Sequence, residues 1–244
     1  MRKGAEPGHV YLVGAGPGDA ELLTVRAAAL LRTATHVLPD GLISAEILAL
    51  ASADATVMPV GKRCGAPRVT QTEINDLLVR LAREGASIVR LKSGDPLVFG
   101  RAGEELAALR AAGVPFEVVP GITAAFAAAA ALGTPLTDRT SASKLILATA
   151  HYAANKVELD PDPQPMWSGP LPADATLALY MPGPDLETLA AELMASGVEG
   201  STPVVAISRI SSAEEQVHRA KLAELRSEDC GPAPVLLLLG RALE

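Results

Sequence analysis

HVYLVGAGPGDAELLT, residues 9–24, decides the class of fold that the rest of the chain has to complete. An apolar run at 9–13 is followed by glycines at positions 14, 16 and 18 and then by a helix expected over 20–31. A short apolar strand, a glycine turn and a helix in this order are the first half of a βαβ unit. We therefore expect an α/β fold with mostly parallel sheets.

The glycine loop GAGPGD, residues 14–19, also lies where ligands bind in such folds. Glycines let a backbone approach a ligand closely, and Asp40 follows near the position of a ribose-binding acid. Against a dinucleotide site, Asp19 replaces the third glycine of the usual fingerprint, and Pro17 lacks the amide that would face a pyrophosphate. The loop alone leaves a nucleotide-type site and a structural turn equally open.

Two further segments end strands in the same manner. RLKSGDP, residues 90–96, and VVPGITA, residues 118–124, each join an apolar strand to a turn. Ligands of open sheets lie beyond the carboxyl ends of strands, so Asp95 is placed to accept hydrogen bonds from a ribose or an amino group. The structural alternatives are an Asp-Pro turn at Asp95 and a plain helix N-cap at Thr123.

The remaining elements predict two lobes. Further strands are expected at 36–38, 56–59, 87–91, 116–119, 145–149, 176–181, 203–207 and 235–239, and further helices at 71–83, 100–112, 123–132, 185–196 and 213–225. The proline-rich stretch 153–172 is expected to be a loop that orders over a site. Because the pattern restarts after Pro120, we predict α/β lobes at 1–120 and 121–244 with a ligand cleft between them.

Composition excludes several classes of partner. The net charge of −7 argues against nucleic acid, whose phosphates require a basic surface. Cys64 and Cys230 are far apart and match no metal-ligand spacing, so no metal is expected. No apolar stretch is long enough for a bilayer and the N-terminus lacks a signal peptide, which predicts a cytoplasmic protein without a membrane partner.

Taken together, the motifs resemble the tetrapyrrole methylase family. VYLVGAGPGDAELLT, VLPDGLIS, VGKR, QTEIN, RLKSGDPLVFGRAGEE and FEVVPGITAA occur in the family's order, and GTPLTDR, LALYMPGP and TPVVAISR match it more loosely. Within the family, VGKR, QTEIN and FGRAGEE resemble uroporphyrinogen-III C-methyltransferases. The resemblance implies the two-lobed class III methyltransferase fold, S-adenosylmethionine folded in the interlobe cleft, S-adenosylhomocysteine as its product, and a homodimer.

The implied activity is methylation of uroporphyrinogen III to precorrin-2 for sirohaem or cobalamin synthesis. Carried over by position, the cofactor contacts are Pro17, Ser93, Gly94, Asp95, Val98, Thr123, Ala124, Met181 and Ile210. Asp40 and Lys62 fall on catalytic positions, and Lys62, Arg63 and Arg101 are expected to bind substrate. The tetrapyrrole supplies its own nucleophilic carbon, so the enzyme has to position it, stabilise developing charge and remove a proton. Arginines suit its carboxylates.

Other functions remain open. Pro39, Arg68, Asp138 and Ile210 stand where the family more often has Tyr, His, His and Gly. These differences favour a later precorrin methyltransferase or a diverged paralogue with another substrate. If the chain were a nicotinamide or flavin oxidoreductase, the second and third glycine segments would be unexplained. A non-catalytic binding protein is the fourth alternative, and it requires that Ile210 block the cofactor pocket. Arg101 is equally well placed to pair with Glu104 or Glu105 within one helical turn.

Overall fold

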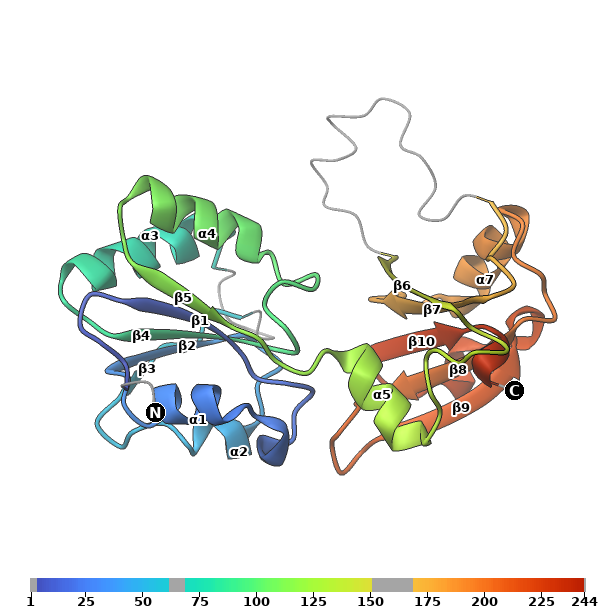
Figure 1. Cartoon of the computed structure of the whole chain (residues 1–244), viewed down its shortest axis with the longest axis horizontal. Coiled ribbons are helices and arrows are strands. Elements are labelled where there is room, and N and C mark those ends of the chain that lie inside the picture. Colours follow the sequence, from blue (N-terminus) through green and yellow to red (C-terminus); the bar gives the residue numbers. More distant parts are fainter. Residues whose placement is uncertain (1–3, 62–68, 151–168, 244) are drawn as a thin grey trace. The chain divides into compact units, whose positions relative to one another are not determined.

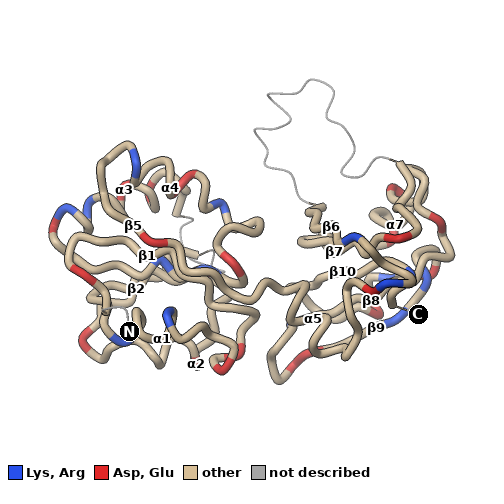
Figure 2. The backbone as a smooth tube through the Cα atoms, in the orientation of Figure 1, with Lys and Arg blue, Asp and Glu red and all other residues tan. Residues whose placement is uncertain are grey.

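The computed structural model describes residues 4–61, 69–150 and 169–243. They form two compact units, Met1–Thr123 and Ala124–Glu244, each with its own sheet and core. No helix of the described residues is both long and apolar enough to cross a membrane. Basic and acidic residues are interspersed along both units (Figure 2).

The N-terminal unit is a parallel sheet with helices on both faces (Figure 1). Its strands lie in the order β3-β2-β4-β1-β5 and are β1 (Val10–Gly14), β2 (His36–Pro39), β3 (Thr56–Val57), β4 (Ile88–Lys92) and β5 (Phe116–Val119). Helices α1 (Val25–Leu31) and α2 (Ala45–Leu48) cover one face, and α3 (Gln71–Arg83) and α4 (Ala102–Ala111) cover the other. The predicted α/β class is confirmed here, with every strand pair parallel.

Alternation along β1 divides the core between the two faces. Val10 and Leu12 pack with the residues of α3 and α4, whereas Tyr11 and Val13 pack with those of α1 and α2. Successive side chains of a strand point to opposite faces, so a central strand buried on both sides has to be apolar throughout. This arrangement leaves the carboxyl end of β1 between those of its neighbours β4 and β5.

The helix predicted over 20–31 is divided in the structure. A short 3-10 turn, η1 (Ala20–Leu22), comes first, with the Asp19 side chain accepting from the Glu21 amide. Helix α1 then begins at Val25, because Thr24 takes an extended conformation and its side chain accepts from the Ala27 amide. An N-cap residue is not itself helical, so the prediction of one continuous helix was wrong.

The C-terminal unit has a mixed sheet. Its strands lie in the order β6-β7-β10-β8-β9 and are β6 (Lys144–Thr149), β7 (Ala175–Tyr180), β8 (Pro203–Ser208), β9 (Gln216–Lys221) and β10 (Val235–Leu239). Among the described residues of this unit, only β6 and β7 pair in parallel, and the other three pairs are antiparallel. The expectation of mostly parallel sheets therefore holds for the first unit and not for the second.

One of these antiparallel pairs, β8 with β9, comes from the segment predicted as a helix over 213–225. It forms strand β9 and the short 3-10 turn η2 (Leu222–Glu224) instead. Strand β9 returns beside β8 as a hairpin, which requires antiparallel pairing and no crossover helix. Leu222 and Leu225 are nevertheless buried, which explains why the apolar spacing resembled a helix.

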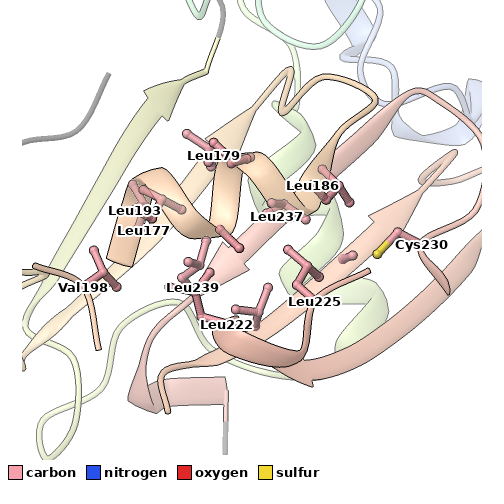
Figure 3. Packing of buried hydrophobic residues seen from close by; sticks show 14 residues of the cluster. Leu177, Leu179, Leu186, Leu193, Val198, Leu222, Leu225, Cys230, Leu237 and Leu239 are labelled. Atoms are coloured by element: carbon pink, nitrogen blue, oxygen red, sulfur yellow. The ribbon is translucent and has the colours of Figure 1, made fainter. Parts of the chain in front are cut away.

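The core of this unit also lies on both faces of its sheet. Helix α7 (Leu186–Ala195) packs Leu186, Leu189 and Leu193 against the leucines of β7 and β10, beside Leu222, Leu225 and Cys230 (Figure 3). On the opposite face, α5 (Ala124–Leu132) contributes Ala125 and Ala128 to a second cluster. The small side chains of α5 permit a close approach of the helix to the strands.

Candidate active site

Three glycines of the motifs meet at the carboxyl ends of β1, β4 and β5. A β-carbon on Gly121 would lie 2.2 Å from the Gly94 carbonyl oxygen and 2.8 Å from Gly14 Cα. A β-carbon on Gly14 would lie 2.5 Å from the Gly121 amide nitrogen. Real β-carbons do not approach backbone atoms this closely, so positions 14 and 121 require glycine, while Gly94 is favoured by its φ of +66°. We call Gly14, Gly94 and Gly121 the glycine junction.

Hydrogen bonds hold this junction together. The Gly16 amide donates to the Gly94 carbonyl at 3.2 Å, and the Gly94 amide donates to the Gly16 carbonyl at 2.8 Å. Asp95 accepts from the Gly121 amide through Oδ2 at 3.0 Å and from the Leu97 amide through Oδ1 at 2.8 Å. The bond from Leu97 corresponds to the Asp-Pro turn of the structural alternative, and the bond from Gly121 ties that turn to the PGIT segment. A carboxylate has further lone pairs, so these bonds leave it able to accept from a ligand.

The other predicted cofactor contacts divide between the two units. In the N-terminal unit, Pro17, Ser93 and Val98 are partly exposed and Thr123 is buried. In the C-terminal unit, Ala124 begins α5, Met181 directly follows β7, and Ile210 follows β8. Ile210 packs against the cluster that contains Ala125 and Ala128.

Left-handed backbone marks some of these same segments. Met181 has φ of +50°, and the two neighbours of Ile210, Arg209 and Ser211, have φ of +49° and +60°. In the N-terminal unit, Phe99 and Arg101 have φ of +52° and +54°. Side-chain-bearing residues rarely adopt this conformation, and those that do concentrate at functional sites. The strained positions therefore favour sites at these strand ends.

A pocket of about 450 Å³ opens within the N-terminal unit. Its wall combines apolar, polar and charged side chains, contributed by Asp40, Val60, Gly61, Val69, Thr70, Gln71, Ile74, Arg90, Lys92, Phe99, Gly100 and Arg101. Thr70 and Gln71 belong to the start of α3, where Thr70 and Glu73 form a capping box. That box also lowers the pKa of Glu73, because its carboxylate accepts from the backbone and hydroxyl of Thr70.

Four charged side chains form a network beside this pocket, and three of them, Asp40, Arg90 and Lys92, line it. Arg90 Nη2 lies 2.5 Å from Asp40 Oδ1, and Arg90 Nε donates to Glu105 Oε1 at 2.9 Å. Lys92 Nζ donates to both Glu105 oxygens, at 3.0 and 3.1 Å. Arg90, Lys92 and Glu105 are buried, whereas the Asp40 side chain is 31% exposed. Asp40 is thus the member of the network that the pocket reaches most easily.

Lys92 has an unusual environment for an ammonium group. Burial lowers its pKa, and the nearby Arg90 lowers it further, while Glu105 and Asp40 raise it. Gly100 closes over its side chain, since a β-carbon on Gly100 would lie 3.2 Å from Lys92 Cε and 2.5 Å from the Pro96 carbonyl oxygen. Within 4–61, 69–150 and 169–243, no group of His, Cys, Asp or Glu is arranged to hold a metal ion.

Comparison with known proteins identifies the family that carries this site. The model of the tetrapyrrole (corrin/porphyrin) methylases matches residues 9–226. The chain belongs to the tetrapyrrole methylase family. This confirms the resemblance drawn from the motifs.

Both curated proteins and solved structures are similar to this chain. Siroheme synthase 1 of Cronobacter sakazakii is 44% identical over 240 residues, which are 97% of this chain and 49% of the relative. The chain thus spans about half the length of the curated relatives it matches. A crystal structure of uroporphyrin-III-C-methyltransferase from Thermus thermophilus is 39% identical, with a TM-score of 0.77 over 97% of this chain and 93% of that one. Another from the same organism, complexed with S-adenyl homocysteine, is 37% identical, with a TM-score of 0.76 over 96% and 98%.

The predicted substrate residues are only partly among the described residues. Lys62 and Arg63 lie outside the described residues, as do Pro67 and Arg68. Gly61, directly before them, packs against the backbone beside Asp40: a β-carbon there would lie 1.9 Å from the Gly41 nitrogen.

Arg101 lies at the rim of the pocket and pairs with Glu104. Its Nε and Nη2 donate to the two Glu104 oxygens at 2.8 and 2.9 Å. Both side chains are about half exposed, at 58% and 50%. This hydrogen bond raises the pKa of Arg101, against a smaller effect of burial. The pairing that the sequence offered for Arg101 therefore occurs, with Glu104 and not with Glu105, and it leaves the guanidinium near solvent.

Sequence reasoning missed the buried charged network beside the pocket. Arg90 and Lys92 were quoted in RLKSGDP but given no role, and Glu105 was considered only as a partner for Arg101. The available signal was two cations on alternate positions of a strand that is otherwise apolar and expected to be buried on both faces. Charged side chains are rarely buried unless paired, so such a strand predicts a buried carboxylate nearby.

Proposed function

We propose that this chain transfers methyl groups from S-adenosylmethionine to carbon atoms of uroporphyrinogen III, giving precorrin-2. The observation that carries the proposal is Asp40, a carboxylate held at the pocket by buried Arg90 in a member of the tetrapyrrole methylase family. Support for the substrate comes from the 39% identical Thermus methyltransferase and from siroheme synthase 1. Because the curated relatives are about twice as long as this chain, their full activity is not carried over to it.

The glycine junction fits a cofactor of this kind. Gly94 has φ of +66°, and a β-carbon there would meet only Thr123 Cα, at 3.8 Å. The turn is thus fixed by its hydrogen bonds with Gly16, while the backbone of Gly94 leaves space for a ligand. We propose Pro17, Ser93, Gly94, Asp95, Val98 and Thr123 as contacts in the N-terminal unit, and Ala124, Met181 and Ile210 in the C-terminal unit. S-adenosylmethionine supplies an electrophilic methyl group when bound.

Asp40 and Lys62 are the proposed catalytic residues. The pyrrole carbon forms the new carbon–carbon bond, so positive charge develops on the ring and a proton has to leave it. A carboxylate at the pocket wall stabilises that charge and accepts the proton, directly or through water. Because Arg90 holds Asp40 on one side, its remaining oxygen is available on the other. Lys62, Arg63 and Arg101 are proposed to bind the carboxylates of the substrate.

The direct test is incubation of the chain with S-adenosylmethionine and uroporphyrinogen III, followed by mass analysis of the tetrapyrrole. We expect a product heavier by two methyl groups, and S-adenosylhomocysteine as the coproduct. If the cofactor binds in calorimetry but uroporphyrinogen III is not methylated, the substrate assignment is wrong. Methylation of a precorrin in the same assay would then favour a later enzyme of the family.

The assembly is proposed on the family resemblance, and the location and excluded partners on the composition of the sequence. We propose a homodimer in the cytoplasm, without a nucleic-acid or membrane partner. Sedimentation analysis of the purified chain tests the first statement, because a dimer has about twice the 25.1 kDa of one chain. A single species at the mass of one chain, at micromolar concentration, contradicts it.

A further inference from the structure

Glu105 carries an inference that deepens the proposed function and rests on it. We propose that Glu105 is a positioning residue for Asp40 and acts through Arg90. Glu105 lies on α4 and is completely buried, whereas Asp40 follows β2 on the far side of the Arg90 side chain. The two carboxylates share one guanidinium, and only Asp40 is exposed to the pocket to a substantial degree.

Glu105 is the centre of the buried part of the network. Its Oε1 accepts from Arg90 Nε at 2.9 Å, from Lys92 Nζ at 3.0 Å and from Gln71 Nε2 at 3.3 Å, and its Oε2 accepts from Lys92 Nζ at 3.1 Å. These donors come from β4 and from the first turn of α3. One carboxylate on α4 therefore fixes side chains from two other elements, β4 and α3. A buried carboxylate with this many partners has a single position.

Arg90 transmits that position to Asp40. Its Nε is held by Glu105, its Nη1 donates to the Leu38 carbonyl at 3.1 Å, and its Nη2 contacts Asp40 Oδ1 at 2.5 Å. A guanidinium is planar and rigid, so fixing Nε also fixes the direction of Nη2. Asp40 is anchored through its backbone as well, because its amide donates to the Leu91 carbonyl at 2.9 Å. With the backbone of Asp40 held, its carboxylate can still rotate about the side-chain bonds, and the contact with Arg90 restricts that rotation.

The charges of the network indicate what the loss of Glu105 does. Two cations, Arg90 and Lys92, face two carboxylates, Glu105 and Asp40. Without the charge of Glu105, both buried cations are left with Asp40 as the carboxylate of the network. Asp40 is then drawn toward them and away from the pocket. A displacement of about 1 Å at a reacting group lowers a rate on the order of 100-fold.

The test is a double-mutant cycle on kcat with Glu105→Gln, Asp40→Asn and the double variant, using the full chain, S-adenosylmethionine and uroporphyrinogen III. We expect Glu105→Gln to lower kcat on the order of 100-fold while the cofactor Kd changes less than about twofold. In the Asp40→Asn background, Glu105→Gln should have no further effect on kcat, because its only route to the reaction is already removed. Multiplying losses would show that Glu105 acts independently of Asp40 and would overturn the proposal.

Two further variants separate positioning from folding. Lys92→Met with Glu105→Gln removes one buried cation together with one buried anion, so the charges that remain are balanced. We expect this double variant to fold and its kcat to lie between those of Glu105→Gln and wild type, because Lys92 no longer draws Asp40 while Arg90 still lacks a charged partner at Nε; a wild-type kcat would overturn the proposal. Glu117→Gln is the matched control. Glu117 forms an ion pair with Arg26, with 2.6 Å between Oε2 and Nη2, and neither residue lines the pocket. It should lower stability without lowering kcat.

The proposed function is tested separately within the same experiment. If wild-type protein does not methylate uroporphyrinogen III, the proposed function fails before any variant is compared. If the wild type is active and Glu105→Gln keeps its kcat, the positioning role alone is wrong.

Discussion

Arg90 contacts Asp40 across two neighbouring parallel strands, with Nη2 2.5 Å from Oδ1, and this contact places a carboxylate at the wall of the N-terminal pocket. Leu38 of β2 is paired in register with Arg90 of β4, so the side chain of Arg90 reaches past the end of β2 to the residue that follows it. The buried guanidinium of Arg90 thus orients the Asp40 carboxylate at the carboxyl end of β2.

Asp40→Asn tests the catalytic role of that carboxylate. Asparagine retains the shape of the side chain but neither accepts a proton nor stabilises positive charge equally well. We expect kcat to fall by roughly 10²- to 10⁴-fold, the range for loss of a general base. The Kd for S-adenosylmethionine, measured by calorimetry, should change little. Equal kcat values for variant and wild type would remove Asp40 from the mechanism.

Gly121→Ala tests the glycine junction. The added methyl group would overlap the Gly94 carbonyl oxygen, 2.2 Å away, and the backbone has to move apart. We expect a loss of about 1–3 kcal/mol in the free energy of unfolding and weaker binding of S-adenosylmethionine.

Gly103→Ala is the control for this substitution. Gly103 lies in α4, and a β-carbon there has no atom within 4 Å. Alanine should raise stability by up to about 1 kcal/mol, because glycine is the poorer helix former. Chemical denaturation and calorimetry measure both effects, and unchanged cofactor affinity in Gly121→Ala would contradict the proposed location of the cofactor.

Arg101→Gln separates substrate binding from the ion pair with Glu104. An exposed pair contributes at most about 1 kcal/mol, so unfolding should change little. If Arg101 binds a substrate carboxylate, KM for uroporphyrinogen III rises about tenfold or more, as expected for a lost charged hydrogen bond. Glu104→Gln breaks the same pair but keeps the guanidinium. Identical KM values for the two variants would mean that the pair, and not Arg101 itself, is what matters.

Asp138→Asn should show a stability difference that depends on pH. Side-chain hydrogen bonds from Ser141 and Thr140, and their backbone amides, lower the pKa of Asp138 in the folded protein. A carboxyl group with a lowered pKa stabilises the fold above its unfolded pKa of about 4, and this contribution is lost as the pH falls below that value. We therefore expect Asp138→Asn to melt at a lower temperature than wild type at pH 7, and the gap to narrow below about pH 4. A gap that is constant from pH 7 to pH 3 would contradict this.

Local signals predicted several elements with accurate bounds. Helix α3 covers the predicted 71–83 because an amphipathic stripe coincides with the Thr70–Glu73 capping box. Strand β10 covers the predicted 235–239 because its apolar run has no helical alternative of that length. In contrast, part of 213–225 forms strand β9 because it pairs with the edge of β8. That pairing depends on the tertiary structure and leaves no signal in the local sequence pattern.

The candidate site was predictable where motifs carry it. Asp40 and Arg101 were found through segments that match the family, and both line the pocket. Glu105 was not assigned to the pocket, because its contacts with Arg90 and Lys92 depend on how α4 packs against β4. Sequence patterns show which residues are charged, and only packing shows which of the charges meet.

The glycine junction separates two kinds of change in this protein. Where Gly14, Gly94 and Gly121 touch, the surface consists of peptide groups, which remain the same whatever side chains surround them. A side chain at position 14 or 121 adds atoms where none fit, and one at position 94 is strained by its φ of +66°. Several pocket residues, in contrast, are side chains that can be exchanged without moving a strand. Substitutions at the pocket can therefore change which acceptor is preferred while the proposed cofactor contacts of the N-terminal unit stay unaltered.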